Sequence, residues 1–164
     1  MSQPHDLSAT QLIPSRTFDD FKQGEIFNIP SRTLSDAHFV AFQAASGDNH
    51  PIHYDRPYCQ AHGHRDLLAH GFMVLIQSAA GAGLLAHAMH ESLIAFLEQS
   101  SEFKKPVYAG DTLYPQLVIA ETKRQTTTGV LTVRSTVRNQ QGDIVMLGMQ
   151  KYLLRLSATS GAAD

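Results

Sequence analysis

An acid and two histidines stand close together in the segment SGDNHPIH, residues 46–53. A carboxylate and a neutral imidazole that converge on one water molecule can hold it and take a proton from it. Fully extended, the five residues from Asp48 to His53 would span about 17 Å, so the two side chains meet only if the segment curls back. Gly47 permits unusual backbone angles and Pro51 fixes its own φ. The pattern predicts an acid–base pair of Asp48 and His53, with a capped turn as the alternative interpretation.

A histidine and a glycine, His70 and Gly71, form a second candidate element just before an apolar stretch. The first residues of a helix carry backbone N–H groups without partners inside the helix, together with partial positive charge. Gly71 would let a ligand approach the bare backbone, and its N–H suits an oxyanion such as a thioester enolate. The alternative is that Gly71 only permits a tight turn into the helix.

Nine histidines occur in the chain, and six of them fall within 33 residues: His38, His50, His53, His62, His64 and His70. Pairs such as His50 with His53, or His62 with His64, have the side chains to ligate zinc. No H-E-x-x-H motif occurs, however, and His87 and His90 lack that spacing. We therefore expect neither a metal nor another cofactor.

Composition limits the classes of function. The chain has 164 residues, a net charge of -2 and 43% hydrophobic residues, which favours one globular domain and no nucleic-acid partner. The single cysteine, Cys59, excludes an internal disulfide and fits a cytoplasmic location, and we expect a buried thiol. The polar N-terminus does not resemble a secretory signal. The apolar stretch 71–88 is interrupted by polar residues, so we expect no membrane span.

The elements that must position these residues follow from periodicity. We expect a strand at 25–34 with an edge or bulge at Pro30, then a helix at 36–45 that Ser35 and Asp36 cap and Ser46-Gly47 ends. A short helix or turn follows and ends near Gly63. One long helix is expected over 71–88, where small residues at 79–83 indicate close packing against another backbone. Strands are predicted at 92–103, 111–125, 129–140 and 144–157, the last of them central in the sheet.

This order predicts an α+β fold, in which an antiparallel sheet packs one face on a helix. We expect a single domain over residues 17–157. Residues 1–16 are expected to form a flexible arm and residues 158–164 a frayed tail. No internal repeat or second domain is visible in the sequence.

Together the two chemical elements are far more specific than either alone. FQAASGDNHPIHYD (42–55) followed by LLAHGFMV (67–74) resembles the MaoC-like dehydratases, the (R)-specific enoyl-CoA hydratase group of hotdog-fold proteins. The motif of that family reads S/T-G-D-x-N-P, an aliphatic residue and H, with a later H-G element. EFKKPVYAGDTL (102–113) also resembles a segment of the family, and the resemblance extends over about residues 17–156.

The resemblance implies a hotdog domain, with the sheet wrapped around the long helix, and a homodimer. Whether the dimers assemble further is left open. It implies reversible hydration of a trans-2-enoyl-CoA to the (R)-3-hydroxyacyl-CoA, with the coenzyme A thioester as substrate and no cofactor. Asp48 and His53 would activate water, and the Gly71 N–H would bind the thioester oxygen. Acyl chain length, branching and pathway are left open.

Two positions depart from the family. His50 stands where the family has asparagine, and Ala79 stands where members often carry a serine near the catalytic aspartate, with Ser78 one residue earlier. We therefore expect a different helix register or another orienting group to support the site. His50, His70 and Ser78 are candidates to support the catalytic pair without contacting the substrate.

Two other functions fit the same fold. An acyl-CoA thioesterase also uses a carboxylate and a helix-end N–H, and it would release free thiol. A non-catalytic dimer that binds acyl-CoA would show tight binding without turnover. The D-x-x-P-x-H segment favours hydration over both.

Overall fold

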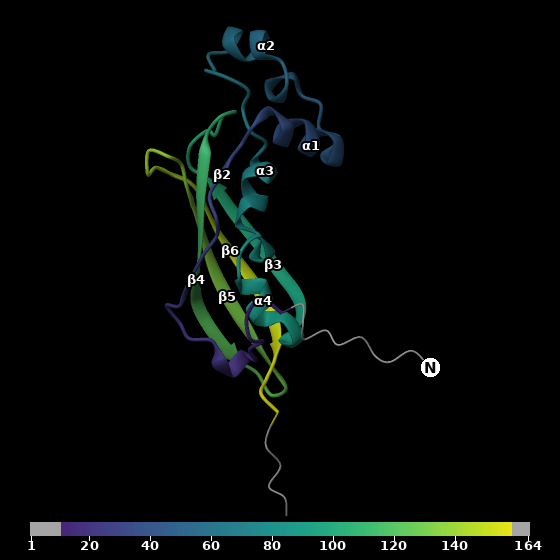
Figure 1. Cartoon of the computed structure of the whole chain (residues 1–164), viewed down its shortest axis with the longest axis vertical. Helices are drawn as coiled ribbons and strands as arrows, with labels where there is room; N and C mark the ends of the chain where they lie inside the picture. The colour runs from purple at the N-terminus through teal and green to yellow at the C-terminus, as the bar shows by residue number, and fades with distance from the viewer. Residues whose placement is uncertain (1–10, 159–164) are drawn as a thin grey trace, which may run out of the picture.

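A six-stranded antiparallel sheet and a line of short helices make up the computed structural model, which describes residues 11–158 (Figure 1). The strands are β1 (Ile26–Asn28), β2 (Arg32–Thr33), β3 (Leu93–Phe103), β4 (Thr112–Arg124), β5 (Thr128–Arg138) and β6 (Ile144–Arg155). Their order is β1-β4-β5-β6-β3, and β2 also pairs with β4. The α+β arrangement expected from the sequence is confirmed.

The helices lie on one face and at one end of the sheet. The α-helices are α1 (Asp36–Ser46), α2 (Arg56–Ala61), α3 (Gly71–Leu75) and α4 (Leu85–Met89). The 3-10 turns are η2 (Phe18–Asp20), η3 (Pro51–His53), η4 (Ile76–Ser78), η5 (Ala80–Ala82) and η6 (His90–Ser92). In Figure 1 the segment from α3 to α4 runs along the sheet, while α1 and α2 lie beyond its end.

The long strands follow the alternation of their side chains. In β5, Val133 and Val137 are fully buried and Arg134 and Arg138 are exposed. β6 lies between β5 and β3, so its prediction as a central strand is confirmed. The predicted strand at 25–34 is instead two short strands, because Pro30 lacks an N–H and the chain breaks its pairing with β4 there.

The single helix predicted over 71–88 is wrong. Ala79 and Gly83 have extended backbone angles and divide the segment into α3, η4, η5 and α4. The Gln150 side chain on β6 donates to the Ser78 carbonyl at 3.0 Å, which replaces a helical hydrogen bond. A Cβ at Gly83 would lie 3.3 Å from the Asn28 carbonyl oxygen and 3.0 Å from Ile29. The close backbone approach expected from the small residues is therefore confirmed, but it breaks the helix.

The helix α1 is confirmed, and its caps position the residues that follow. The Ser35 side chain and His38 form a capping box at its start. Gly47, at φ 70°, ends it with a hydrogen bond to the Gln43 carbonyl. Its buried residue is Phe39, whereas Val40 is 65% exposed.

Two clusters of apolar side chains form the core. One fills the space between α4 and the sheet, and the other lies beneath α1, α2 and α3 and supports the site. Within the part of the expected arm that the structure describes, Ile13 packs against the first cluster and Arg16 pairs with Glu25. Residues 1–10 of that arm and 159–164 of the expected tail lie outside the described residues. Within 11–158, no helix has the length and apolar character to cross a membrane.

Candidate active site

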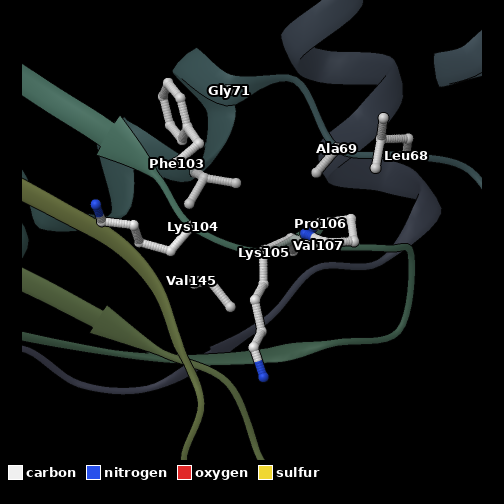
Figure 2. Close-up of a pocket in the computed structure, with 10 residues that line it drawn as sticks. Leu68, Ala69, Gly71, Phe103, Lys104, Lys105, Pro106, Val107 and Val145 are labelled. Atoms are coloured by element: carbon white, nitrogen blue, oxygen red, sulfur yellow. The ribbon is translucent and has the colours of Figure 1, made fainter.

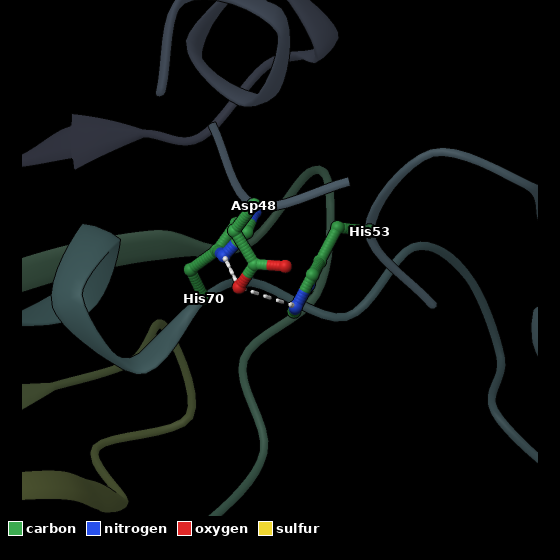
Figure 3. A group of neighbouring side chains, drawn as sticks. All are labelled: Asp48, His53 and His70. Carbon is green, nitrogen blue, oxygen red and sulfur yellow. Dashed lines mark ion pairs between the residues drawn. The ribbon is translucent and has the colours of Figure 1, made fainter. Parts of the chain in front are cut away.

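The segment after α1 curls back and brings Asp48 and His53 together (Figure 3). The Ser46 hydroxyl accepts from the Asp48 N–H at 3.2 Å, and the Asp48 Oδ1 accepts from the His50 N–H at 3.2 Å. His53 lies in η3, which Pro51 begins. The side chain of Asp48 is 51% exposed and that of His53 is 13% exposed. The pair therefore lies at the surface with the imidazole mostly covered.

Hydrogen bonding defines which nitrogen of His53 carries the proton. Its Nδ1 lies 2.6 Å from the carbonyl oxygen of Leu68, and a carbonyl only accepts. Nδ1 is therefore the donor, and in the neutral ring Nε2 presents a lone pair. That Nε2 lies 4.0 Å from the Asp48 Oδ2. Neither atom carries a proton, so they cannot bond to each other, but they are close enough to accept from one shared donor.

A water molecule fits between these two acceptors. Placed about 2.8 Å from each, it would subtend an angle of about 90°, close to the angle between the two O–H bonds of water. Both protons would then be donated, one to Asp48 and one to His53. The oxygen lone pairs would remain for attack on an electrophile.

His70 is the third member of the cluster. It precedes α3, and its Nδ1 lies 3.1 Å from the same Asp48 Oδ2. Its ring stacks on that of His53 with centroids 3.5 Å apart and planes inclined by 19°. The centroid of the Phe42 ring also lies 4.9 Å from that of His70. His70 is 5% exposed, so the cluster has one buried imidazole, one partly covered imidazole and one exposed carboxylate.

Hydrogen bonding and burial determine the charges of Asp48 and His70. The His50 N–H is the main cause that holds the pKa of Asp48 below its ordinary value, with contributions from His70 and His53. Burial is the main cause that lowers the pKa of His70, which the Asp48 carboxylate offsets only in part. At neutral pH, Asp48 is thus ionised and His70 is neutral.

The same three side chains are a poor match for a single metal ion. One ligand atom from each lies within 4.8 Å of the others. The lone pairs of imidazole lie in the ring plane, however, and the planes of His53 and His70 are nearly parallel. One ion cannot lie in both planes unless a ring rotates out of the stack.

His50 has a local structural contact at the position where the family has asparagine. Its Nδ1 accepts from the Ile52 N–H at 3.3 Å and caps η3. An asparagine oxygen can accept the same bond. The His50 ring also lies edge-on to Tyr58, which stacks on His62. His50 therefore reaches Asp48 only through its backbone N–H among the contacts described.

Ser78 lies in a different environment from the cluster. Its hydroxyl donates to the Leu75 carbonyl at 2.8 Å, and it approaches the Gln150 amide at 3.4 Å. Tyr152 donates to Gln150 at 2.6 Å, and burial raises the pKa of Tyr152 to about 12. Ser78 thus belongs to a buried polar network that breaks the central helix, and His70 is the imidazole that contacts Asp48.

Gly71 borders a cavity of about 390 Å³ between α3 and the end of β3 (Figure 2). The Phe103 ring lies beside it, 3.0 Å from where a Cβ would stand. Apolar side chains and the stems of two lysines complete the wall: Leu68, Ala69, Val74, Lys104, Lys105, Pro106, Val107 and Val145. Asp48, His53 and His70 are not among its lining residues, although Ala69 and Gly71 flank His70.

Two charged side chains near the site, Arg65 and Lys105, have partners within the chain. Arg65 pairs with the buried Asp111 at 2.5 Å and lies over the Tyr108 ring. Lys105 pairs with Asp143 at 2.8 Å. These groups hold loops together. Cys59 is fully buried, as expected, and its thiol donates to the Ile52 carbonyl.

Two contacts of the site have no distinct signal in the sequence. The Leu68 carbonyl that holds His53 is a backbone group, which any residue type supplies. The Phe42 ring beside His70 comes from α1, and nothing in the local sequence indicates that this ring reaches a residue 28 positions further along the chain. The His70-Gly71 pair was visible as a motif, but the stacking of His70 on His53 was not.

Comparisons with known proteins identify the family of the chain. The model of the MaoC-like domain matches residues 21–141. An (R)-specific enoyl-CoA hydratase of Rhodospirillum rubrum is 29% identical over 111 residues, which cover 65% of this chain and 71% of the relative. A Streptomyces griseus relative, 26% identical over 70% of this chain and 79% of its own length, has the name UPF0336 protein, which states no activity.

Solved structures support the same fold. A monoamine oxidase regulatory protein from Archaeoglobus superposes with a TM-score of 0.81 at 24% identity, over 87% of this chain and 96% of that one. A Mycobacterium tuberculosis protein described as having a double hotdog fold superposes with a TM-score of 0.76 at 25% identity, over 88% of this chain and 46% of that one. The fold is therefore the hotdog fold. Because the family model matches more than half of the chain, the protein belongs to the MaoC-like domain family.

Proposed function

We propose that the protein hydrates a trans-2-enoyl-CoA reversibly to the (R)-3-hydroxyacyl-CoA. The observation that carries this proposal is the 4.0 Å gap between Asp48 Oδ2 and His53 Nε2, two acceptors that one water can bridge. Family membership and the names of the enoyl-CoA hydratase relatives support the choice of substrate class. The fold and the site together thus favour addition of water to an activated double bond.

The reaction balances with the groups present. The bridging water attacks C3 while one of its protons passes to the pair, and the electrons of the C2–C3 double bond move onto the thioester oxygen. An imidazole ordinarily binds a proton more tightly than a carboxylate, so His53 Nε2 takes this proton. The proton is then delivered to C2 on the face from which the water attacked. The result is syn addition of one water, with Asp48 and His53 returned to their initial states.

The Gly71 N–H is the proposed donor to the thioester oxygen. It stands at the first position of α3 and on the wall of the apolar cavity. Because α3 has five residues, we attribute the stabilisation to the direct hydrogen bond and not to a helix dipole. Charge that develops on the oxygen would meet this donor in a site lined mainly by apolar side chains.

We also infer that the reaction needs no metal, because the stacked imidazoles do not share a plane, and no other cofactor, because the steps above use only water and the side chains of the site. Elemental analysis of the purified protein is expected to find no stoichiometric metal, and treatment with a chelator should leave kcat/KM unchanged. A stoichiometric metal whose removal abolishes turnover would contradict this inference.

A homodimer that pairs β3 with β3 of a second copy is the proposed assembly. β3 is an edge strand that exposes Ile94, Phe96, Leu97 and Phe103, all between 44% and 55% exposed. Such an apolar edge would otherwise favour uncontrolled pairing. Phe103 also borders the cavity, so the partner would lie near the substrate. The double hotdog neighbour is consistent with two such folds packing together.

Replacing Leu97 by lysine is expected to convert the dimer into a monomer, because lysine on an edge strand opposes strand pairing. Light scattering after size-exclusion chromatography measures the mass. Ile26→Lys is the matched control, since Ile26 is 56% exposed on the opposite edge and should leave the dimer intact. A monomeric wild-type protein would contradict the proposed assembly.

Loss of the enoyl-thioester absorbance on mixing with crotonyl-CoA tests the function, followed by longer and branched enoyl-CoAs. We expect loss of absorbance without release of free thiol. Release of thiol without hydration would identify a thioesterase, and tight binding without either change would identify a binding protein. Both results would overturn the proposal.

A further inference from the structure

His70 is the most deeply buried titratable group of the site, and the proposed reaction steps do not use it. It is 5% exposed, and three different contacts surround its ring. One edge faces Asp48 at 3.1 Å, one face stacks on His53 at a centroid distance of 3.5 Å, and Phe42 lies at 4.9 Å. A single buried side chain therefore contacts both members of the proposed catalytic pair.

We propose that His70 is a positioning residue that holds Asp48 through its Nδ1–H and holds His53 through ring stacking. This inference rests on the proposed hydratase function for its effect on turnover. The structural part of the inference is that His70 carries its proton on Nδ1 and donates it to Asp48. This part does not depend on which reaction the protein catalyses. It assigns to His70 the support that Ala79 cannot give, because Ala79 has no hydroxyl.

The contacts of His70 define its protonation. A carboxylate oxygen only accepts, so Nδ1 carries the proton in the bond to Asp48. Nε2 is buried and has no hydrogen-bond partner among residues 11–158. A second proton there would leave a buried N–H donor unpaired, which is costly. The ring is therefore neutral with its proton on Nδ1, in agreement with the burial that lowers its pKa.

The second contact explains how His53 keeps its orientation. The Leu68 carbonyl holds one nitrogen, which leaves the ring free to turn about that bond. Stacking on His70 restricts this rotation and directs Nε2 to the side where Asp48 lies. Because catalysis is sensitive to displacements of about 1 Å, loss of either contact should slow the chemical step more than binding.

Two substitutions separate the two contacts. His70→Asn keeps an N–H donor near the position of Nδ1 but removes the ring. His70→Phe keeps a ring that can stack but removes the donor. We expect His70→Phe to lower kcat by roughly tenfold to a hundredfold with little change in KM. His70→Asn should recover part of this loss, because it restores the donor to Asp48.

The pH profile distinguishes positioning from a merely structural role. The titratable side chains that face Asp48 are His70 and His53, and the His50 backbone N–H also donates to it. Removing the His70 donor makes the ionised carboxylate less stable, so the pKa of Asp48 should rise. The titration of the Asp48 carboxyl carbon, followed by NMR as the pH is changed, reports this pKa directly. It should move to higher pH in His70→Phe and less in His70→Asn.

Nitrogen NMR of histidine-labelled wild-type protein gives a readout that needs no activity. We expect the neutral Nδ1–H form of His70. A folded His70→Phe variant with wild-type kcat and an unchanged titration of Asp48 would overturn the inference, as would a wild-type His70 protonated on Nε2. If the variant does not fold, His70→Asn and the NMR result still decide. Absence of hydratase activity in the wild type, with the Nδ1–H form present, would instead contradict only the proposed function.

Discussion

Replacing Asp48 by asparagine is expected to lower kcat/KM for enoyl-CoA hydration at least about a hundredfold, the lower end of acid–base effects. The change is nearly isosteric, but the carboxylate accepts from two donors, the His50 N–H and the His70 Nδ1–H. An amide offers one oxygen, so one of these donors would face an N–H₂ group. The water would also lose the negative charge that orients it.

The matched control for this change is His50→Asn, two residues away. It restores the residue of the family and can keep the bond from the Ile52 N–H. We expect a much smaller loss than in Asp48→Asn. Steady-state kinetics on both purified variants checks the pair. Near-wild-type hydration by Asp48→Asn would show that its carboxylate is not part of the catalytic pair.

Replacing His53 by alanine is expected to have an effect of similar size, also at least about a hundredfold in kcat/KM. The change removes the Nε2 that lies 4.0 Å from Asp48 and is the proposed acceptor of the proton from water. It also leaves the Leu68 carbonyl without its donor and one face of His70 without its stacking partner. Thermal unfolding must therefore accompany the kinetics to separate lost chemistry from lost folding.

His62→Ala is the control for His53→Ala, since it removes an imidazole from the same part of the chain. His62 is exposed, stacks on Tyr58 and makes no contact with Asp48 among those described. We expect an unchanged kcat/KM. If His53→Ala is folded and behaves like this control, the assignment of His53 as the proton acceptor is wrong.

Much of the fold could be predicted from local patterns because the strands are regular. The alternation of valines and arginines in β5 places one face inward without any knowledge of the partner strands. The end of α1 was likewise visible in Gly47, because glycine readily adopts the positive φ needed there.

The break in the central segment could not be predicted because its causes lie elsewhere in the chain. Gln150 lies on a strand, 72 residues after Ser78 in the sequence, and its side chain donates to the Ser78 carbonyl. Gly83 meets the backbone of Asn28 and Ile29, so its role depends on tertiary packing. The apolar stretch itself matches a continuous buried helix, whereas these contacts come from distant parts of the chain.

The candidate site shows the same limit. The spacing of Asp48 and His53 suggested that they meet, but the curl that brings them to 4.0 Å depends on hydrogen bonds to Ser46 and His50. The stack of His70 on His53 joins two segments that the sequence treats as separate motifs. Residue types and spacing thus indicate the chemistry of the site, but which side chains contact one another can be seen only in the folded structure.

Hydration of crotonyl-CoA in D₂O tests the central claim most directly, with the product analysed by NMR and chiral chromatography. The proposed function predicts the (R)-alcohol, and the water bridged by Asp48 and His53 predicts one deuterium at C2 on the same face as the new hydroxyl. Deuterium on the opposite face would contradict delivery of water and proton from one side by this pair, and an (S) or racemic product would contradict the proposed (R)-specific hydration.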